Sequence, residues 1–182
     1  MKFKAFIAFS GVFLVLSLNS TTANAANVQI CKGKPIAWRS DRASMYISRS
    51  TMPEEGDWSR LTLASMSEWS YVGGANFLFY YGRYSGSSTN LSNGRNEITF
   101  GQTANSTALA ETKRRRRCSW SFGVRRYWLE ADVVMSNSPE IHWSTDPFSF
   151  EETDDSIYNF PIVMQHELGH VVGLSHFDES PA

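Results

Sequence analysis

The segment from His166 to His176 constrains this chain more than any other part of its 182 residues. Its sequence is His-Glu-Leu-Gly-His-Val-Val-Gly-Leu-Ser-His. His166 and His170 are four residues apart, so on a helix both imidazoles project from one face and can bind one metal ion. Gly173 allows the chain to leave that helix through a left-handed conformation, which returns His176 to the same ion. The spacing predicts a helix, a tight turn and a site with three histidine ligands.

Glu167 follows the first histidine and is placed to reach a water on the ion without binding the metal. Three neutral imidazoles leave a fourth coordination position open, which is typical of catalytic rather than structural zinc. Zn²⁺ lowers the pKa of its bound water towards about 7 and polarises a carbonyl oxygen. A carboxylate beside the ion can take the proton of that water and pass it to a leaving amine. We therefore expect His166, His170 and His176 to bind zinc and Glu167 to be the general base in peptide hydrolysis.

The alternative interpretation of this segment is a buried helix whose histidines are ordinary core residues. Its apolar side chains would form the buried face: Leu168, Val171, Val172 and Leu174. Core packing gives no reason for three histidines, a glutamate and a glycine at fixed spacings. Five fixed positions match by chance with a probability on the order of 10⁻⁵ in a chain of this length. The pattern therefore favours a metal site.

The N-terminus indicates where the protein functions. Lys2 and Lys4 precede an apolar run from Ala5 to Leu18, and Ala23-Asn24-Ala25 has small residues where signal peptidase recognises its substrates. We predict a secretory signal peptide over residues 1–25, cleaved after Ala25, and a secreted or periplasmic protein. The alternative is a membrane anchor, but the apolar run is shorter than the roughly 20 residues that a spanning helix needs. We expect no membrane association after cleavage.

Residues 26–182 would then form the mature chain, which is long enough for one domain with a substantial core. The net charge of the whole sequence is −1, which argues against nucleic acid as a partner. Export also affects the two cysteines, because an isolated pair in an oxidising compartment most simply forms a disulfide. We expect Cys31 and Cys118 to be bonded. The alternative is that Cys31 binds the zinc as a thiolate, as the propeptide cysteine of the matrix metalloproteinases does.

Hydrophobic periodicity predicts a chain that contains both strands and helices. The expected strands are residues 45–48, 77–81, 97–100, 108–112 and 128–135, with a helix over 57–71 and a loop over 82–94. Asn159 is a plausible N-cap, and Pro161 is tolerated in the first turn of a helix. The helix that carries the histidines should therefore begin near residue 159 and end near Val172.

The histidine segment, the Asn159-capped helix and the strand Glu130-Ala131-Asp132-Val133-Val134 together resemble the metzincin zinc metallopeptidases, and among them the matrixin-type group with its small bacterial members. The resemblance implies an α+β fold with a twisted mixed β-sheet, a backing helix and a zinc-binding active-site helix. It implies a secreted, monomeric zinc endopeptidase. An extended peptide or protein substrate would add to the edge of the sheet, for which residues 108–112 are the candidate strand.

Two features depart from that family. Metzincins have a methionine turn and a specificity loop beyond the third histidine, and this sequence stops at Ala182 before either. Phe177 stands where matrixins usually have serine or threonine. We expect the sequence to be a piece of a longer chain. The alternative is a natural truncation, which would make residues 26–182 a non-catalytic exported zinc-binding module. A third hypothesis is an adhesin-like surface domain that binds through exposed aromatic and serine residues.

The remaining charged features have structural interpretations. The basic run Lys113–Arg117 predicts a solvated loop rather than an anion-binding site. The acidic run Glu151–Asp155 lacks the ligand spacing of a calcium loop, so a Ca²⁺ site, which the family resemblance allows, has no clear motif. His142 is expected to be a lone surface histidine. Asp132 is expected to form hydrogen bonds at the end of a strand rather than to act as a catalytic acid.

Overall fold

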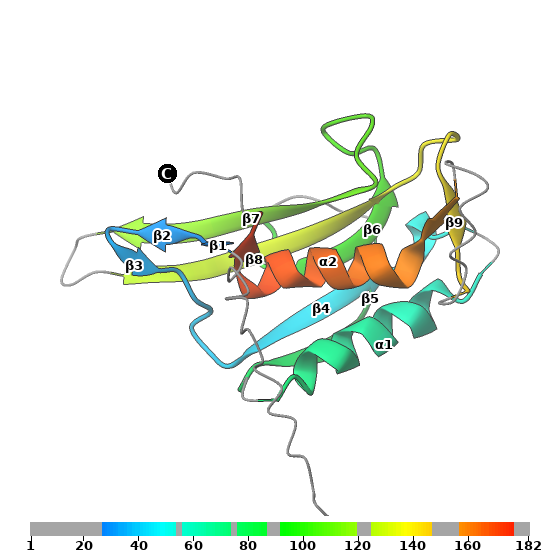
Figure 1. Ribbon diagram of the computed structural model, residues 1–182. Coiled ribbons are helices and arrows are strands. Elements are labelled where there is room, and N and C mark those ends of the chain that lie inside the picture. Colours follow the sequence, from blue (N-terminus) through cyan, green and yellow to red (C-terminus); the bar gives the residue numbers. More distant parts are fainter. Residues whose placement is uncertain are drawn as a thin grey trace, which may run out of the picture.

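The computed structural model describes residues 27–53, 56–73, 76–86, 92–119, 125–146 and 157–176. These residues form a mixed α/β fold in which one face of a five-stranded mixed sheet is covered by two α-helices (Figure 1). The expected combination of a mixed sheet, a backing helix and a helix that carries the histidines is therefore present.

The central sheet has the strand order β5-β4-β6-β8-β7. β5, β4, β6 and β8 pair in parallel, and the edge strand β7 runs antiparallel to β8. Two helices pack on it, α1 (Trp58–Ser70), which connects β4 to β5, and α2 (Phe160–Val172). The strands are β4 (Arg42–Ser48), β5 (Leu78–Ser85), β6 (Asn96–Gly101), β7 (Ala110–Ser119) and β8 (Arg125–Ser136).

The core lies between the sheet and the two helices. Alternate residues of β8 face the helices because side chains of a strand point to opposite faces in turn. The buried face of α2 follows the helical period of 3.6 residues. The residues of these two elements in the core are Ala131, Val133, Met135, Phe160, Met164, Leu168 and Val171.

The opposite face of the sheet is also buried at its centre, but its side chains there are acidic. Glu130 and Asp132 of β8 have no solvent exposure. Glu130 accepts hydrogen bonds from the backbone N–H groups of Asn93 and Gly94, and Asp132 accepts one from the N–H of Glu97 at 2.8 Å. The hydrogen-bonding role expected for Asp132 is confirmed, but the residue lies inside β8 because that strand continues to Ser136.

Two predicted loops are strands. β5 continues through Gly82 to Ser85, so the loop expected from residue 82 is wrong for the first four residues. A Cβ on Gly82 would lie 2.8 Å from the ring of Tyr46 on the neighbouring strand, which explains a glycine inside this strand. β7 begins at Ala110 rather than residue 108 and continues to Ser119, so the prediction of a solvated loop at Lys113–Arg117 is also wrong.

Short strand pairs surround the sheet. β1 (Asn27–Val28) pairs antiparallel with β11 (Leu174–Ser175), immediately before His176. β2 (Ile30–Cys31) and β3 (Lys34–Pro35) form a hairpin. β9 (His142–Ser144) pairs in parallel with β10 (Ile157–Asn159), and η1 (Arg49–Thr51) is a short 3₁₀ helix after β4.

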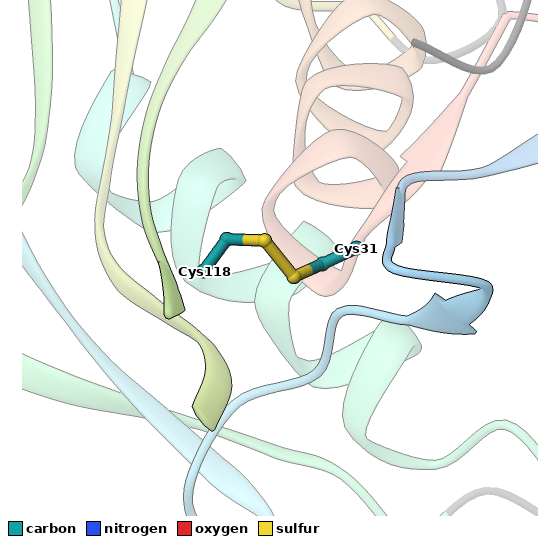
Figure 2. The surroundings of a disulfide bond; sticks show 2 residues. All are labelled: Cys31 and Cys118. Carbon is teal, nitrogen blue, oxygen red and sulfur yellow. A yellow bond between two sulfur atoms is a disulfide. The ribbon is translucent and has the colours of Figure 1, made fainter. Parts of the chain in front are cut away.

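A disulfide joins Cys31 of β2 to Cys118 of β7 (Figure 2), with their Cα atoms 6.0 Å apart. The predicted disulfide is thus confirmed, and the thiolate alternative for Cys31 is wrong because its sulfur is bonded to Cys118. The bond fastens the hairpin near the N-terminus to the edge strand of the sheet.

Three sequence predictions fall outside the described residues: the signal peptide over 1–25, the acidic run Glu151–Asp155, and the segment from Phe177 to Ala182. Within the part that the structure describes, neither helix has the length and apolar character needed to cross a membrane.

Candidate metal centre

The helix α2 has the start and end that its sequence predicts. The side chain of Asn159 accepts a hydrogen bond from the N–H of Ile162 at 3.2 Å, and Pro161 lies in the first turn. The helix ends at Val172, and Gly173 takes the left-handed conformation with φ 112° and ψ 6°. Its N–H donates to the carbonyl of His170 at 3.0 Å. This glycine cap turns the chain back along the helix into β11.

The turn brings the three predicted histidine ligands together. The Nε2 atoms of His166 and His176 are 3.0 Å apart, and the Nε2 atom of His170 lies 3.1 Å from each of them. Among the residues that the structure describes, these three form the group of His, Cys, Asp or Glu side chains that is close enough to hold a metal ion. His166 and His176 are exposed, so the centre opens to solvent.

Hydrogen bonds among the rings cannot account for this triangle. The Nδ1 nitrogen of His170 lies 2.9 Å from the carbonyl oxygen of Leu174, and because a carbonyl only accepts, Nδ1 carries a proton there. In the neutral ring Nε2 then carries a lone pair and only accepts. Because each Nε2 atom either donates or accepts, at least one of the three mutual contacts joins two donors or two acceptors. Nitrogens at these spacings are close enough for one metal ion to be bound by all three. The donor set therefore suits a metal ion better than it suits ring-to-ring hydrogen bonds.

The surroundings of His170 favour the neutral imidazole that a metal ion binds. Burial lowers the pKa of His170 from its ordinary value of 6.5, because the charged ring loses hydration. The carbonyl of Leu174 and the carboxylate of Glu167 oppose that shift, while His166 and His176 add to it. The neutral form is the one with a lone pair for the metal.

Glu167 lies beside this triangle and is 5% exposed. Its Oε2 accepts a hydrogen bond of 2.5 Å from the hydroxyl of Thr112 on β7. That hydroxyl also lies 3.1 Å from the carbonyl oxygen of Glu167. The sequence predicts Thr112 at the end of the candidate cleft strand, but nothing in the spacing of residues 112 and 167 indicates its contact with the glutamate.

Arg114 is a second neighbour of the site that the sequence did not reveal. Its Nη1 atom donates to the carbonyls of His170 at 3.1 Å and of Leu174 at 2.9 Å. Its guanidinium lies 5.1 Å from the ring centroid of Trp128. The residue belongs to the basic run that was expected to be solvated. Alternation along a strand would have placed it on the same face as Thr112, had the segment been identified as a strand.

A pocket with a volume of about 390 Å³ adjoins the centre on the side of His166. Its walls come from both helices and from the residues just after α1: Glu68, Trp69, Val72, Ile162, Gln165 and His166. The indole N–H of Trp69 donates to the carbonyl of Gln165 at 2.8 Å and links α1 to α2 at this point. The pocket supplies an apolar surface directly next to a candidate ligand.

The fourth histidine, His142, is exposed on β9 and is not part of the triangle, as expected for a surface residue. The centre is thus built from α2, the turn after it, and two side chains of the edge strand. Comparisons of the chain with protein-family models, with curated proteins and with solved structures find no match in any of the three.

Proposed function

We propose that this chain is a secreted zinc-dependent endopeptidase of the matrixin-like metzincin type. The observation that carries the proposal is the triangle of three imidazole nitrogens with the carboxylate of Glu167 beside it. A structural ion bound by three histidines has no use for a neighbouring general base. A catalytic ion does, because its open position holds the water that the base must deprotonate.

In the proposed reaction His166, His170 and His176 hold the zinc ion. When bound there, zinc would supply the Lewis acidity that lowers the pKa of a water and polarises the scissile carbonyl. Glu167 takes the proton of that water and later delivers it to the amine of the cleaved peptide. Its low exposure limits competition from bulk water for the carboxylate.

The substrate in this proposal is an extended peptide that lies along β7. This strand pairs with β8 on one side and is the last strand of the sheet on the other. An added peptide strand would form main-chain hydrogen bonds with little demand on its sequence. The contact between Thr112 and Glu167 brings the first part of β7 next to the reactive group, which supports this placement.

Two further observations agree with the proposal. The mixed sheet with a backing helix and a histidine-bearing helix is the arrangement that the metzincin resemblance implies. The disulfide between Cys31 and Cys118 suits an exported protein, because such bonds persist in oxidising compartments.

The test uses purified protein and an unfolded protein substrate with quenched fluorophores. The wild-type protein should release fluorescence, lose activity with a zinc chelator and recover it with added Zn²⁺. Glu167→Gln should retain zinc and lose several orders of magnitude in turnover. Glu140→Gln, which changes an exposed glutamate after β8, is the matched control and should behave as wild type.

Undiminished hydrolysis by Glu167→Gln would contradict the mechanism. Stoichiometric zinc without hydrolysis in the wild-type protein would instead favour the non-catalytic zinc-binding module. Activity or partner binding that persists after complete removal of zinc would contradict a zinc peptidase.

A further inference from the structure

We infer that the edge strand β7 positions the metal centre through two side chains with separate tasks. Arg114 holds the turn that brings His176 to His170, and Thr112 orients the carboxylate of Glu167. The role of Thr112 rests on the proposed peptidase function. The role of Arg114 depends only on metal binding by the three histidines.

Both residues point to the same face of β7 because they are two positions apart. They pair with Val133 and Ala131 of β8, whose side chains lie in the core under the helices. Thr112 meets the first half of the histidine segment, and Arg114 meets its end. Thr112 and Arg114, two residues apart on β7, therefore contact the general base and the turn before the third ligand, respectively.

Arg114 binds the turn at two carbonyls that have different roles. The carbonyl of His170 lies in the last turn of α2, where it accepts the N–H of Gly173 and carries the partial negative charge of the helix end. The carbonyl of Leu174 lies in β11, two residues before His176, and also accepts the Nδ1–H of His170. One arginine nitrogen therefore joins the helix that carries two candidate ligands to the strand that leads to the third.

The position of Arg114 is itself fixed by packing. Its guanidinium lies over Trp128, which is 2% exposed and packs against Cys31 and Ile36. A Cβ on Gly173 would lie 3.2 Å from Nε1 of the same indole, so the turn rests directly on this ring. Trp128 therefore supports both the arginine and the turn that the arginine holds.

Thr112 acts on the base rather than on the ligands. Its hydroxyl holds Oε2 of Glu167 and lies near the main-chain carbonyl of the same residue. With Oε2 held, the carboxylate keeps one orientation, and the other oxygen remains for the proton of a metal-bound water. A buried carboxylate without this contact would sample other rotamers.

The first experiment measures zinc affinity by competition with a chelating dye, together with the visible spectrum of the Co²⁺-substituted protein. Arg114→Met should weaken zinc binding by about 10- to 100-fold, the usual loss when a partner of a ligand is removed, and should alter the Co²⁺ spectrum. Arg116→Met removes the same charge from an exposed position on β7 and should change neither. Arg114→Lys retains the charge and should recover part of the affinity.

Unchanged affinity in Arg114→Met, or equal losses in Arg114→Met and Arg116→Met, would overturn the role of Arg114. If Arg114→Met does not fold, the zinc affinities of Arg114→Lys and Arg116→Lys are compared instead. Wild-type affinity in Arg114→Lys, with an unaltered Co²⁺ spectrum, would then overturn the role, because an ammonium lacks the rigid planar donors that reach both carbonyls from over Trp128.

The second experiment separates kcat from KM at saturating zinc. Thr112→Val keeps the shape of the side chain and removes the hydroxyl, so kcat should fall about 10- to 100-fold with KM and zinc affinity unchanged. Thr112→Ser restores the hydroxyl and should restore most of kcat. Full kcat in Thr112→Val, or equally low kcat in both variants, would overturn the role of Thr112. An inactive wild-type protein would overturn it together with the proposed function, while the metal measurements would still decide the role of Arg114.

Discussion

The Nδ1–H of His170 donates to the carbonyl oxygen of Leu174 over 2.9 Å, across the glycine turn that ends α2. This bond fixes the orientation of the ring and leaves Nε2 as the nitrogen that faces His166 and His176. Such partners of a ligand raise its basicity and hold it in place. The orientation of the second candidate ligand thus depends on the backbone conformation that delivers the third.

Removal of the third ligand should affect metal binding before it affects the fold. In His176→Ala two imidazoles remain, so zinc affinity should fall by more than the roughly 100-fold typical of losing a ligand's partner. Added zinc should also raise the melting temperature of His176→Ala by less than that of wild type, because this increase depends on the affinity of the folded state for zinc. His142→Ala, at the exposed histidine of β9, is the control. Full zinc content in His176→Ala would remove this residue from the ligand set.

The turn between the two ligands should tolerate only glycine. Gly173 has a φ of 112°, and an added Cβ would lie 3.2 Å from the indole nitrogen of Trp128. Gly173→Ala should lower the free energy of unfolding by about 1–2 kcal/mol and weaken zinc binding, because β11 is displaced. Gly73→Ala is the matched control, since it has no positive φ and no atom within 4 Å of the new Cβ. Denaturant titration of metal-free protein and zinc competition would check both effects. Equal stability of the two variants would contradict the prediction.

The candidate ligands could be identified from the sequence because the signals that place them are local. The cap at Asn159, the four-residue spacing of His166 and His170, and the glycine at 173 act within one helix and its turn. Each is a statement about neighbouring residues, which a sequence shows directly. The structure brings these parts together as the pattern indicates.

Strand β7 could not be identified in the same way because its conformation depends on distant partners. Five consecutive basic residues are typical of a solvated loop. Here Arg115 forms an ion pair with the buried Glu130 at 3.1 Å, Lys113 pairs with Glu111 at 2.9 Å, and Arg114 turns inward. The contacts of Arg114 and Arg115 are with residues distant in the sequence, so they arise only in the folded protein. Tertiary pairing therefore overrides the local composition.

The disulfide should contribute strongly to stability because it closes a long loop. Cys31 and Cys118 are 87 residues apart, and loop-closure entropy for that length corresponds to about 4–5 kcal/mol, with 2–5 kcal/mol usual for native disulfides. Cys31→Ser with Cys118→Ser should lower the free energy of unfolding by an amount in that range. Reduction of the wild-type protein should lower its free energy of unfolding by a similar amount. The same reducing agent should not change the stability of the double variant. A double variant as stable as wild type in denaturant titrations would contradict a structural disulfide.

The pKa of Asp132 makes a distinct prediction about pH. Burial raises this pKa from 3.8 to about 7, and the neighbouring carboxylates of Glu130 and Glu97 add to the shift, while the N–H of Glu97 and the charge of Lys113 oppose it. The folded protein therefore binds more protons at this residue than the unfolded chain between about pH 4 and pH 7. The free energy of unfolding must fall as pH rises through that range. The contribution of Asp132 protonation to the free energy of unfolding is fully present below about pH 4 and is lost above about pH 7.

Asp132→Asn removes this titration while keeping an oxygen that can accept the N–H of Glu97. The free energy of unfolding of the metal-free variant should fall less than that of wild type between pH 4 and pH 7, by on the order of 3 kcal/mol. Metal-free protein is needed because histidine protonation would otherwise release zinc in the same range. Glu140→Gln removes an exposed carboxylate and should follow the wild-type curve. Parallel curves for wild type and Asp132→Asn in denaturant titrations across this range would show that Asp132 does not titrate with a raised pKa.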